Sequence, residues 1–95
     1  MSAFKNRVVS IYNHKTSMRM ADAEWSAFDT ICQREEKTRK QLLEVIDTCK
    51  DPRRGLTFSV RLFTLTYFRL VCENNHKRPN TPKPDLIREA LKNIV

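Results

Sequence analysis

The sequence lacks the features on which several protein classes depend. It has one glycine in 95 residues, which argues against a turn-rich β-sandwich and against a glycine-rich phosphate loop. No hydrophobic run approaches the roughly 18 residues of a membrane helix, and the first ten residues lack the apolar stretch of a secretory signal. The chain also has no GxSxG, HExxH or paired-carboxylate pattern. We therefore expect a cytoplasmic protein that is not an enzyme, has no cofactor or metal, and does not bind a membrane.

Cysteine is also too scarce to provide a disulfide framework. Cys32, Cys49 and Cys72 are odd in number and lie 17 and 23 residues apart, which fits neither a disulfide set nor a CxxC metal site. Their apolar neighbours indicate reduced core residues. A chain of this size has a marginal core. Without disulfides, we expect it to gain stability by forming a homodimer.

Positive charge is what the sequence has in excess, +7 overall, and it is unevenly distributed. Residues 1–20 carry +4 and no acid, whereas residues 21–36 carry −4. Residues 37–55 and residues 76–95 each carry +3. Basic arms and loops of this kind suggest nucleic acid or another polyanion as partner. The alternative is a solvated basic surface with no partner.

The first regular pattern is an alternation of polar and apolar side chains over residues 15–20. Met18 and Met20 share one face of the predicted strand, which is the face for a core. The hydrophilic face comprises Lys15, Ser17 and Arg19.

Residues 7–12 are also rich in β-forming residues. Asn13-His14 is a candidate turn that would fold them back, but no Asn-Gly signal supports a tight hairpin. A strand without a neighbour leaves its backbone edges unpaired. We therefore expect the same strand of a second chain to pair with it antiparallel.

Two helices are predicted after the strand. Apolar residues recur at helical spacing over about 22–36, with Asp22 as N-cap and Trp25 as a core anchor. The second helix is predicted from Thr38 to about Lys50, because the threonine is followed three residues later by a glutamine, a capping-box pattern.

The second half of the chain has a weaker pattern. Residues 56–72 favour a strand by propensity, but the run is long for a strand and its apolar spacing fits a buried helix, which we predict. Residues 74–84 are predicted to be a proline-bearing linker. Residues 85–95 are predicted to be a short amphipathic helix. The chain then divides into a domain over 1–73, the linker and the C-terminal helix.

These segments resemble the ribbon-helix-helix DNA-binding proteins, the Arc-type repressor superfamily. They are most similar to a bacterial subfamily of small ribbon-helix-helix domains with a Gly-His-Arg-Thr-Ser strand. The resemblance covers about residues 7–70. The matching runs are His14–Met20, Glu24-Trp25, Val45–Asp47 and Gly55–Phe63.

The chain departs from the subfamily at three positions. Asn13 stands where the subfamily usually has glycine. Glu36 stands where a glycine often ends the first helix, so we expect that turn to be less tight. Phe58 replaces a small residue in the third segment, so we expect the local packing to differ.

The resemblance implies a mostly α-helical, intertwined homodimer with a two-stranded antiparallel intermolecular sheet, to which this chain adds a third helix and a C-terminal helix. The ribbon would enter the major groove of double-stranded DNA in the nucleoid, and the start of the second helix would meet the DNA backbone. Candidate base-contacting residues are Lys15, Ser17 and Arg19. Candidate phosphate-contacting residues are Thr38, Arg39 and Lys40, with Arg53 and Arg54 as additional backbone contacts. A solvated hydrophilic surface is the alternative for each set.

The leading hypothesis is a sequence-specific DNA-binding dimer that regulates transcription, as a repressor because no activation or ligand-sensing segment is evident. Two alternatives stay open. In one, the fold is a scaffold and residues 80–95 dock on a protein partner, as antitoxins of this superfamily do with their toxins. In the other, net charge drives binding to nucleic acid without sequence preference.

Overall fold

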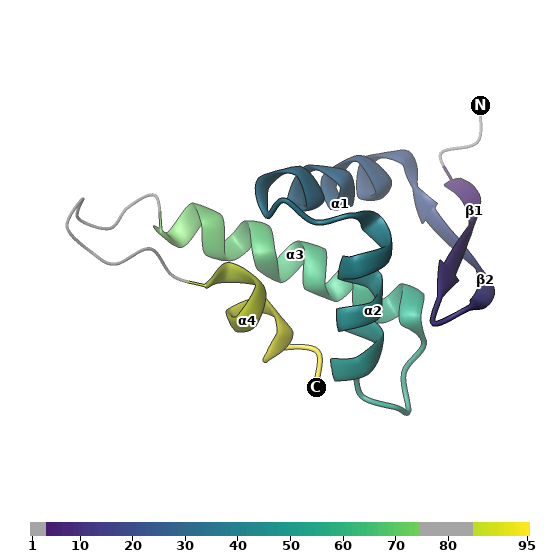
Figure 1. The fold of residues 1–95 in the computed structure, drawn as a ribbon. Coiled ribbons are helices and arrows are strands. Elements are labelled where there is room, and N and C mark those ends of the chain that lie inside the picture. The colour runs from purple at the N-terminus through teal and green to yellow at the C-terminus, as the bar shows by residue number, and fades with distance from the viewer. Residues whose placement is uncertain (1–3, 75–84) are drawn as a thin grey trace.

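Two strands, β1 (Phe4–Ile11) and β2 (His14–Ala21), begin the computed structural model, which describes residues 4–74 and 85–95. The helices of the described residues are α1 (Asp22–Arg34), α2 (Arg39–Cys49), α3 (Leu56–Asn74) and α4 (Leu86–Leu91). Figure 1 shows the two strands on one side of α1, α2 and α3, with α4 on the other. The predicted order of ribbon, helix and helix, followed by two added helices, is confirmed.

The two strands form a hairpin within one chain. β1 pairs with β2 antiparallel along its whole length. The loop between them is Tyr12-Asn13, and both residues have positive φ, 47° and 65°. Positive φ at both central residues is the type I′ geometry of a two-residue hairpin. Asparagine enters this left-handed region readily, whereas tyrosine does so at a cost.

Contacts with α2 offset the cost of the left-handed tyrosine. The Tyr12 amide donates to Glu44 Oε2 at 2.8 Å, and the Tyr12 hydroxyl donates to the Glu44 carbonyl at 3.1 Å. The same hydroxyl shares a hydrogen bond with Thr48 Oγ1. The turn of the hairpin is thereby attached to α2.

This hairpin corrects the predicted intermolecular sheet. The partner strand expected from a second chain is residues 4–11 of the same chain. The candidate turn Asn13-His14 is one residue off, because His14 already pairs with Ile11 and the loop is Tyr12-Asn13. This loop reaches the tight-turn geometry without Asn-Gly, with the help of Glu44. One edge of β2 is therefore paired within the chain, and its other edge has no partner strand among the described residues.

The ends of α1 differ in detail from the prediction. Its N-cap is Ala21 and not Asp22, because Glu24 Oε1 accepts a hydrogen bond from the Ala21 amide at 2.9 Å. At the other end Glu36 has φ 55°, and the Lys37 amide donates to the Cys32 carbonyl at 2.9 Å. This is the closure of a Schellman motif, normally made with glycine. The turn therefore closes tightly without one.

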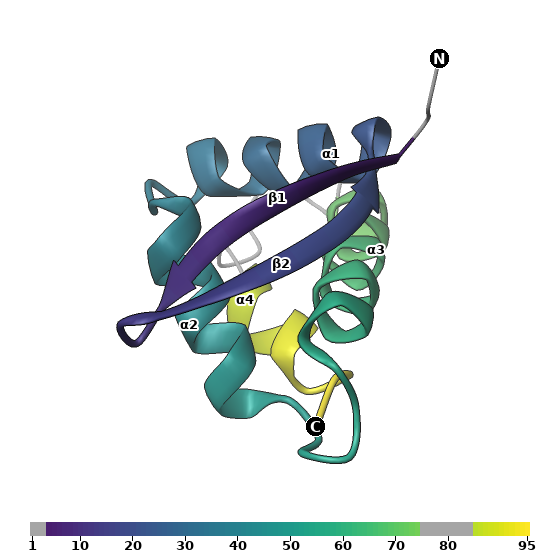
Figure 2. The same cartoon turned by 90° about the vertical axis from the view of Figure 1, so that its right-hand side faces the viewer.

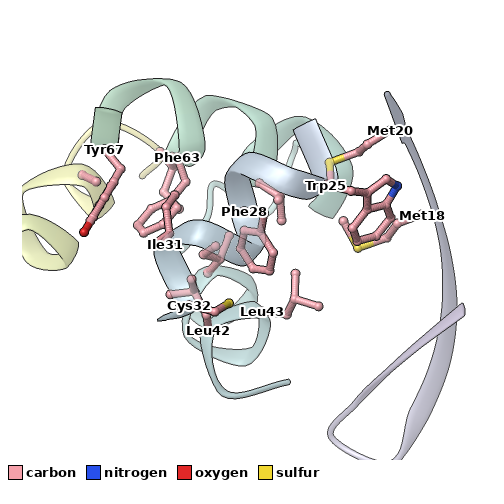
Figure 3. Close-up of a cluster of buried hydrophobic side chains, with 14 of the residues drawn as sticks. Met18, Met20, Trp25, Phe28, Ile31, Cys32, Leu42, Leu43, Phe63 and Tyr67 are labelled. Carbon is pink, nitrogen blue, oxygen red and sulfur yellow. The ribbon is translucent and has the colours of Figure 1, made fainter. Parts of the chain in front are cut away.

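The core begins under the inner face of the hairpin and continues between the helices, where Ile31, Phe63 and Tyr67 lie (Figure 3). Met18, Met20 and Trp25 are each 1% exposed, as the alternation and the helical spacing predicted. All three cysteines are free, but only Cys32 is fully buried; Cys49 is half-buried and Cys72 is exposed. The prediction of three core cysteines is thus correct for the first alone.

Residues 56–72 are helical, as predicted, within the longer α3. Phe58, which departs from the subfamily, lies on its surface with 50% of its area exposed. The guanidinium carbon of Arg54 lies 5.0 Å from the Phe58 ring centroid. The extra aromatic volume is therefore accommodated outside the core.

The C-terminal helix is shorter than predicted and docks on its own domain. Asp85 caps α4 by accepting a hydrogen bond from the Arg88 amide at 3.1 Å. Leu86, Ala90 and Ile94 are buried, and α4 packs against α3. Of the predicted linker, residue 74 belongs to α3 and residues 75–84 lie outside the described part of the chain. Within that part, no helix has the length and hydropathy of a membrane span.

Candidate nucleic-acid interface

β2 presents the predicted base-contacting residues together on one open surface. Lys15, Ser17 and Arg19 are all exposed and alternate with the buried methionines. Figure 2 views the hairpin from this side, with the helices behind it. The structure thus brings the three residues together as predicted, and their contact with DNA bases stays a prediction.

The sequence analysis missed that β1 contributes half of this surface. Residues directly opposite each other in an antiparallel pair share a face of the sheet. The outward pairs are Phe4 with Ala21, Asn6 with Arg19, Val8 with Ser17, and Ser10 with Lys15. We call the six residues of the last three pairs the outer face. The β-rich composition of residues 7–12 was the available signal, but their outward residues were not considered because the partner strand was assigned to a second chain.

The outer face is electropositive. It holds two cations and no acidic side chain. Neither Lys15 nor Arg19 forms an ion pair with any residue in 4–74 or 85–95. The Arg19 guanidinium carbon lies 5.4 Å from the Phe4 ring centroid. Both cations therefore remain available to an anionic partner.

The start of α2 has the cap that the sequence predicted. Thr38 Oγ1 accepts a hydrogen bond from the Gln41 amide at 3.0 Å, and Gln41 Oε1 accepts one from the Thr38 amide at 2.9 Å. The Thr38 side chain is therefore engaged in capping. The amides of Arg39 and Lys40, the first two of the helix, have no acceptor within it. Such a helix start favours an anion.

The two bases in this turn differ in their surroundings. Arg39 forms a bidentate pair with Asp29 of α1, at 2.7 and 2.9 Å from Nη2, and its side chain is 35% exposed. Lys40 is exposed and forms no ion pair with the described residues. Arg39 therefore joins α1 to α2, and Lys40 is the base that is not engaged by the protein.

Trp25 holds the hairpin and the α2 start in a fixed relation. Its Nε1 donates to the Lys5 carbonyl of β1 at 3.1 Å. The guanidinium carbons of Arg7 and Arg39 lie 5.0 Å and 5.4 Å from its ring centroid, within cation–π range. Residues of β1, α1 and α2 thus meet at one buried side chain.

The structure does not bring Arg53 and Arg54 to the α2 start. They lie on the loop at the other end of that 11-residue helix, about 16 Å away. Asp51 holds both, at 3.0 Å from Arg53 Nη2 and 4.0 Å from Arg54 Nε. Hydrogen bonds from Arg53 keep the pKa of the Asp51 carboxyl below its usual value.

Within the described residues, no group of His, Cys, Asp or Glu is placed to hold a metal ion.

A family model described as a ribbon-helix-helix domain matches residues 4–68. That range includes the hairpin, α1, α2 and most of α3. Searches of curated proteins and of solved structures found no match.

Proposed function

The chain belongs to the ribbon-helix-helix domain family, and we propose that it binds double-stranded DNA sequence-specifically and represses transcription. Domains of this family are generally those of non-enzymatic DNA-binding regulators. The outer face of the hairpin enters the major groove, where Lys15, Ser17 and Arg19 contact bases. The observation that carries this proposal is that open face, with two uncompensated cations and no acid.

The dimensions of a hairpin suit this role. The major groove is about 12 Å wide and admits a two-stranded ribbon. Alternate residues along a strand are about 6.6 Å apart, which is close to two base-pair steps of about 3.4 Å. Lys15, Ser17 and Arg19 therefore follow the base pairs at roughly every second step. Lysine and arginine donate to guanine O6 and N7, and serine either donates or accepts.

The start of α2 supplies the backbone contact in this proposal. The free amides and positive helix end attract a phosphate, and Lys40 adds an exposed ammonium. Thr38 orders the turn, and Arg39 holds it against α1 through Asp29. Arg53 and Arg54, which lie beyond the other end of α2, would contact a separate stretch of the DNA backbone.

The test is selection of bound DNA from a random pool at stated salt, followed by affinity measurements on the selected site. We expect Arg19→Ala to relax preference at the base it contacts and to cost about 1–3 kcal/mol on the selected site. Arg69→Ala is the matched control, because it removes the same charge from an exposed site on α3. Equal losses on selected and random DNA would exclude base reading by Arg19, and absence of any selected site would leave the non-specific alternative.

The scaffold alternative requires residues 80–95 to dock on a protein partner. In the described segment 85–95, Leu86, Ala90 and Ile94 are buried against this chain, whereas Val95 is 73% exposed. Docking on the chain itself thus uses part of the apolar surface that this alternative assigned to a partner, and the alternative stays open. Homodimer formation by this chain stays a prediction; members of the family usually form dimers. Sedimentation equilibrium without DNA tests it, and twice the mass of one chain is the expected result.

A further inference from the structure

The two strands of this ribbon carry different chemistry on the outer face. A ribbon made from the same strand of two identical chains has two-fold symmetry, so both strands present the same side chains. Here one strand presents Lys15, Ser17 and Arg19, and the other presents Asn6, Val8 and Ser10. All six are exposed. The cations lie on β2, and β1 is uncharged on this side.

Asn6 has the chemistry of an adenine reader. Its side-chain amide has one donor group and one acceptor side by side, which match adenine N6 and N7 in the major groove. The side chain is exposed and forms no hydrogen bond with the described residues. Its neighbour across the ribbon is Arg19, whose guanidinium matches guanine.

Val8 is an apolar residue of the outer face that does not belong to the core. It is 70% exposed near the middle of β1, while the core face of the same strand is filled by Val9 and Ile11. An apolar side chain at the surface of a ribbon in the major groove meets the 5-methyl group of thymine. Its neighbour across the ribbon is Ser17.

We infer that β1 is a second base-reading strand, with Asn6 contacting adenine and Val8 contacting the methyl group of thymine. One chain then reads an asymmetric site, with A·T pairs under β1 beside guanine under β2. This inference rests on the proposed DNA binding and adds its base preference. It needs no second chain to complete the reading surface.

Two modified DNAs test the two contacts separately. In the site selected by the unaltered protein, 7-deazaadenine removes the N7 acceptor and deoxyuridine removes the thymine methyl group. When the contacted A·T pair is replaced by another base pair, we expect the affinity of the unaltered protein to fall about 5- to 150-fold. Replacing adenine by 7-deazaadenine should cause part of this loss, because it removes only the N7 acceptor. For deoxyuridine we expect a loss of about fourfold, the value of one methyl group.

The variants Asn6→Ala and Val8→Ser should each become insensitive to their own modification while keeping sensitivity to the other. Asn93→Ala makes the same amide-to-methyl change beyond α4, and Leu65→Ser replaces an equally exposed apolar residue on α3 (67% exposed). Both controls should keep the full response to the modified DNAs. Thermal unfolding of each variant confirms that the hairpin is folded.

The outcomes separate this inference from the function on which it rests. If the unaltered protein binds no DNA, the proposed function fails. If it selects a site, but Asn6→Ala and Val8→Ser respond to both modified DNAs like the unaltered protein, β1 does not read bases and the function stands. A selected site with two-fold symmetry centred on the ribbon would equally overturn the inference.

Discussion

The first turns of α1 and α2 place side chains of opposite charge at the positive end of their helix dipoles. α1 begins with Asp22 and Glu24, two acids at the positive end of the helix dipole. α2 begins with Arg39 and Lys40, two bases at the equivalent end. The first arrangement stabilises its helix, and the second opposes it.

At the α1 start, both acids have a cationic partner within the protein: Asp22 pairs with Lys5, and Glu24 with Arg61. Glu24 accepts a hydrogen bond from the Ala21 amide and pairs with Arg61 of α3. Burial raises the pKa of Glu24, but the Ala21 amide and Arg61 together outweigh it and hold the pKa below its usual value. The carboxylate is therefore stabilised by folding.

At the α2 start only half of the charge is matched. Asp29 neutralises Arg39, and Lys40 remains uncompensated among the described residues. Departures from the locally stabilising choice concentrate at functional surfaces. The comparison teaches that the protein matches both acids at the start of α1, whereas at the start of α2 one of the two bases has no charge partner among the described residues.

Replacing Trp25 should have the largest effect, because this side chain joins both helix starts. Trp25→Ala should lower the free energy of unfolding by about 3–5 kcal/mol, through lost burial and the cavity left behind. Trp25→Phe keeps most of the volume and should cost about 1–2 kcal/mol, through the lost hydrogen bond to the Lys5 carbonyl. Urea unfolding followed by circular dichroism measures both. A loss below about 1 kcal/mol for the alanine variant would show that the starts are held independently.

Neutralising Glu24 should have an intermediate effect that depends on pH. Glu24→Gln keeps an acceptor for the Ala21 amide but loses the charge opposite Arg61, at a cost of about 0.5–1 kcal/mol at neutral pH because the pair is partly exposed. Because the pKa of Glu24 is lower in the folded state than in the unfolded state, its ionisation stabilises the fold when the pH is above the pKa of the unfolded state. This stabilisation is lost as the pH falls through the pKa of the folded state.

The unfolding free energies of the original protein and Glu24→Gln should therefore converge as pH falls from the usual carboxyl value of 4.5 downward. Glu73→Gln, at an exposed pair with Arg69 on α3, is the control and should cost less than about 0.5 kcal/mol at any pH. A gap that stayed constant with pH would assign the Glu24 effect to packing.

Changing Lys40 should have the smallest effect on stability and the opposite sign. Lys40→Glu places an acid at the positive helix end and should raise the free energy of unfolding by about 0.3–1 kcal/mol. The same change should weaken binding to every DNA sequence. Lys40→Ala should lower the slope of log affinity against log salt by about one unit. If Lys40→Glu destabilised the protein, the contrast between the two helix starts would be lost.

The features that depend on neighbouring residues were predictable from the sequence. The alternation around Met18 and Met20 and the Thr38 capping box need only local geometry, and both are present. The hairpin was underestimated because the left-handed Tyr12 depends on Glu44, 32 residues away. The engagement of Arg39 by Asp29 was likewise not predictable, because it arises only when α1 and α2 pack.

The hairpin turn also determines how the ribbon responds to dilution. A sheet built between two chains exists only as long as the chains associate, so its population falls with protein concentration. Here the strands are joined by Tyr12-Asn13, and closing so short a loop is fast and nearly local in sequence. The outer face can therefore assemble on a newly made chain before that chain meets another copy. The protein would retain a complete ribbon even at a few molecules per cell.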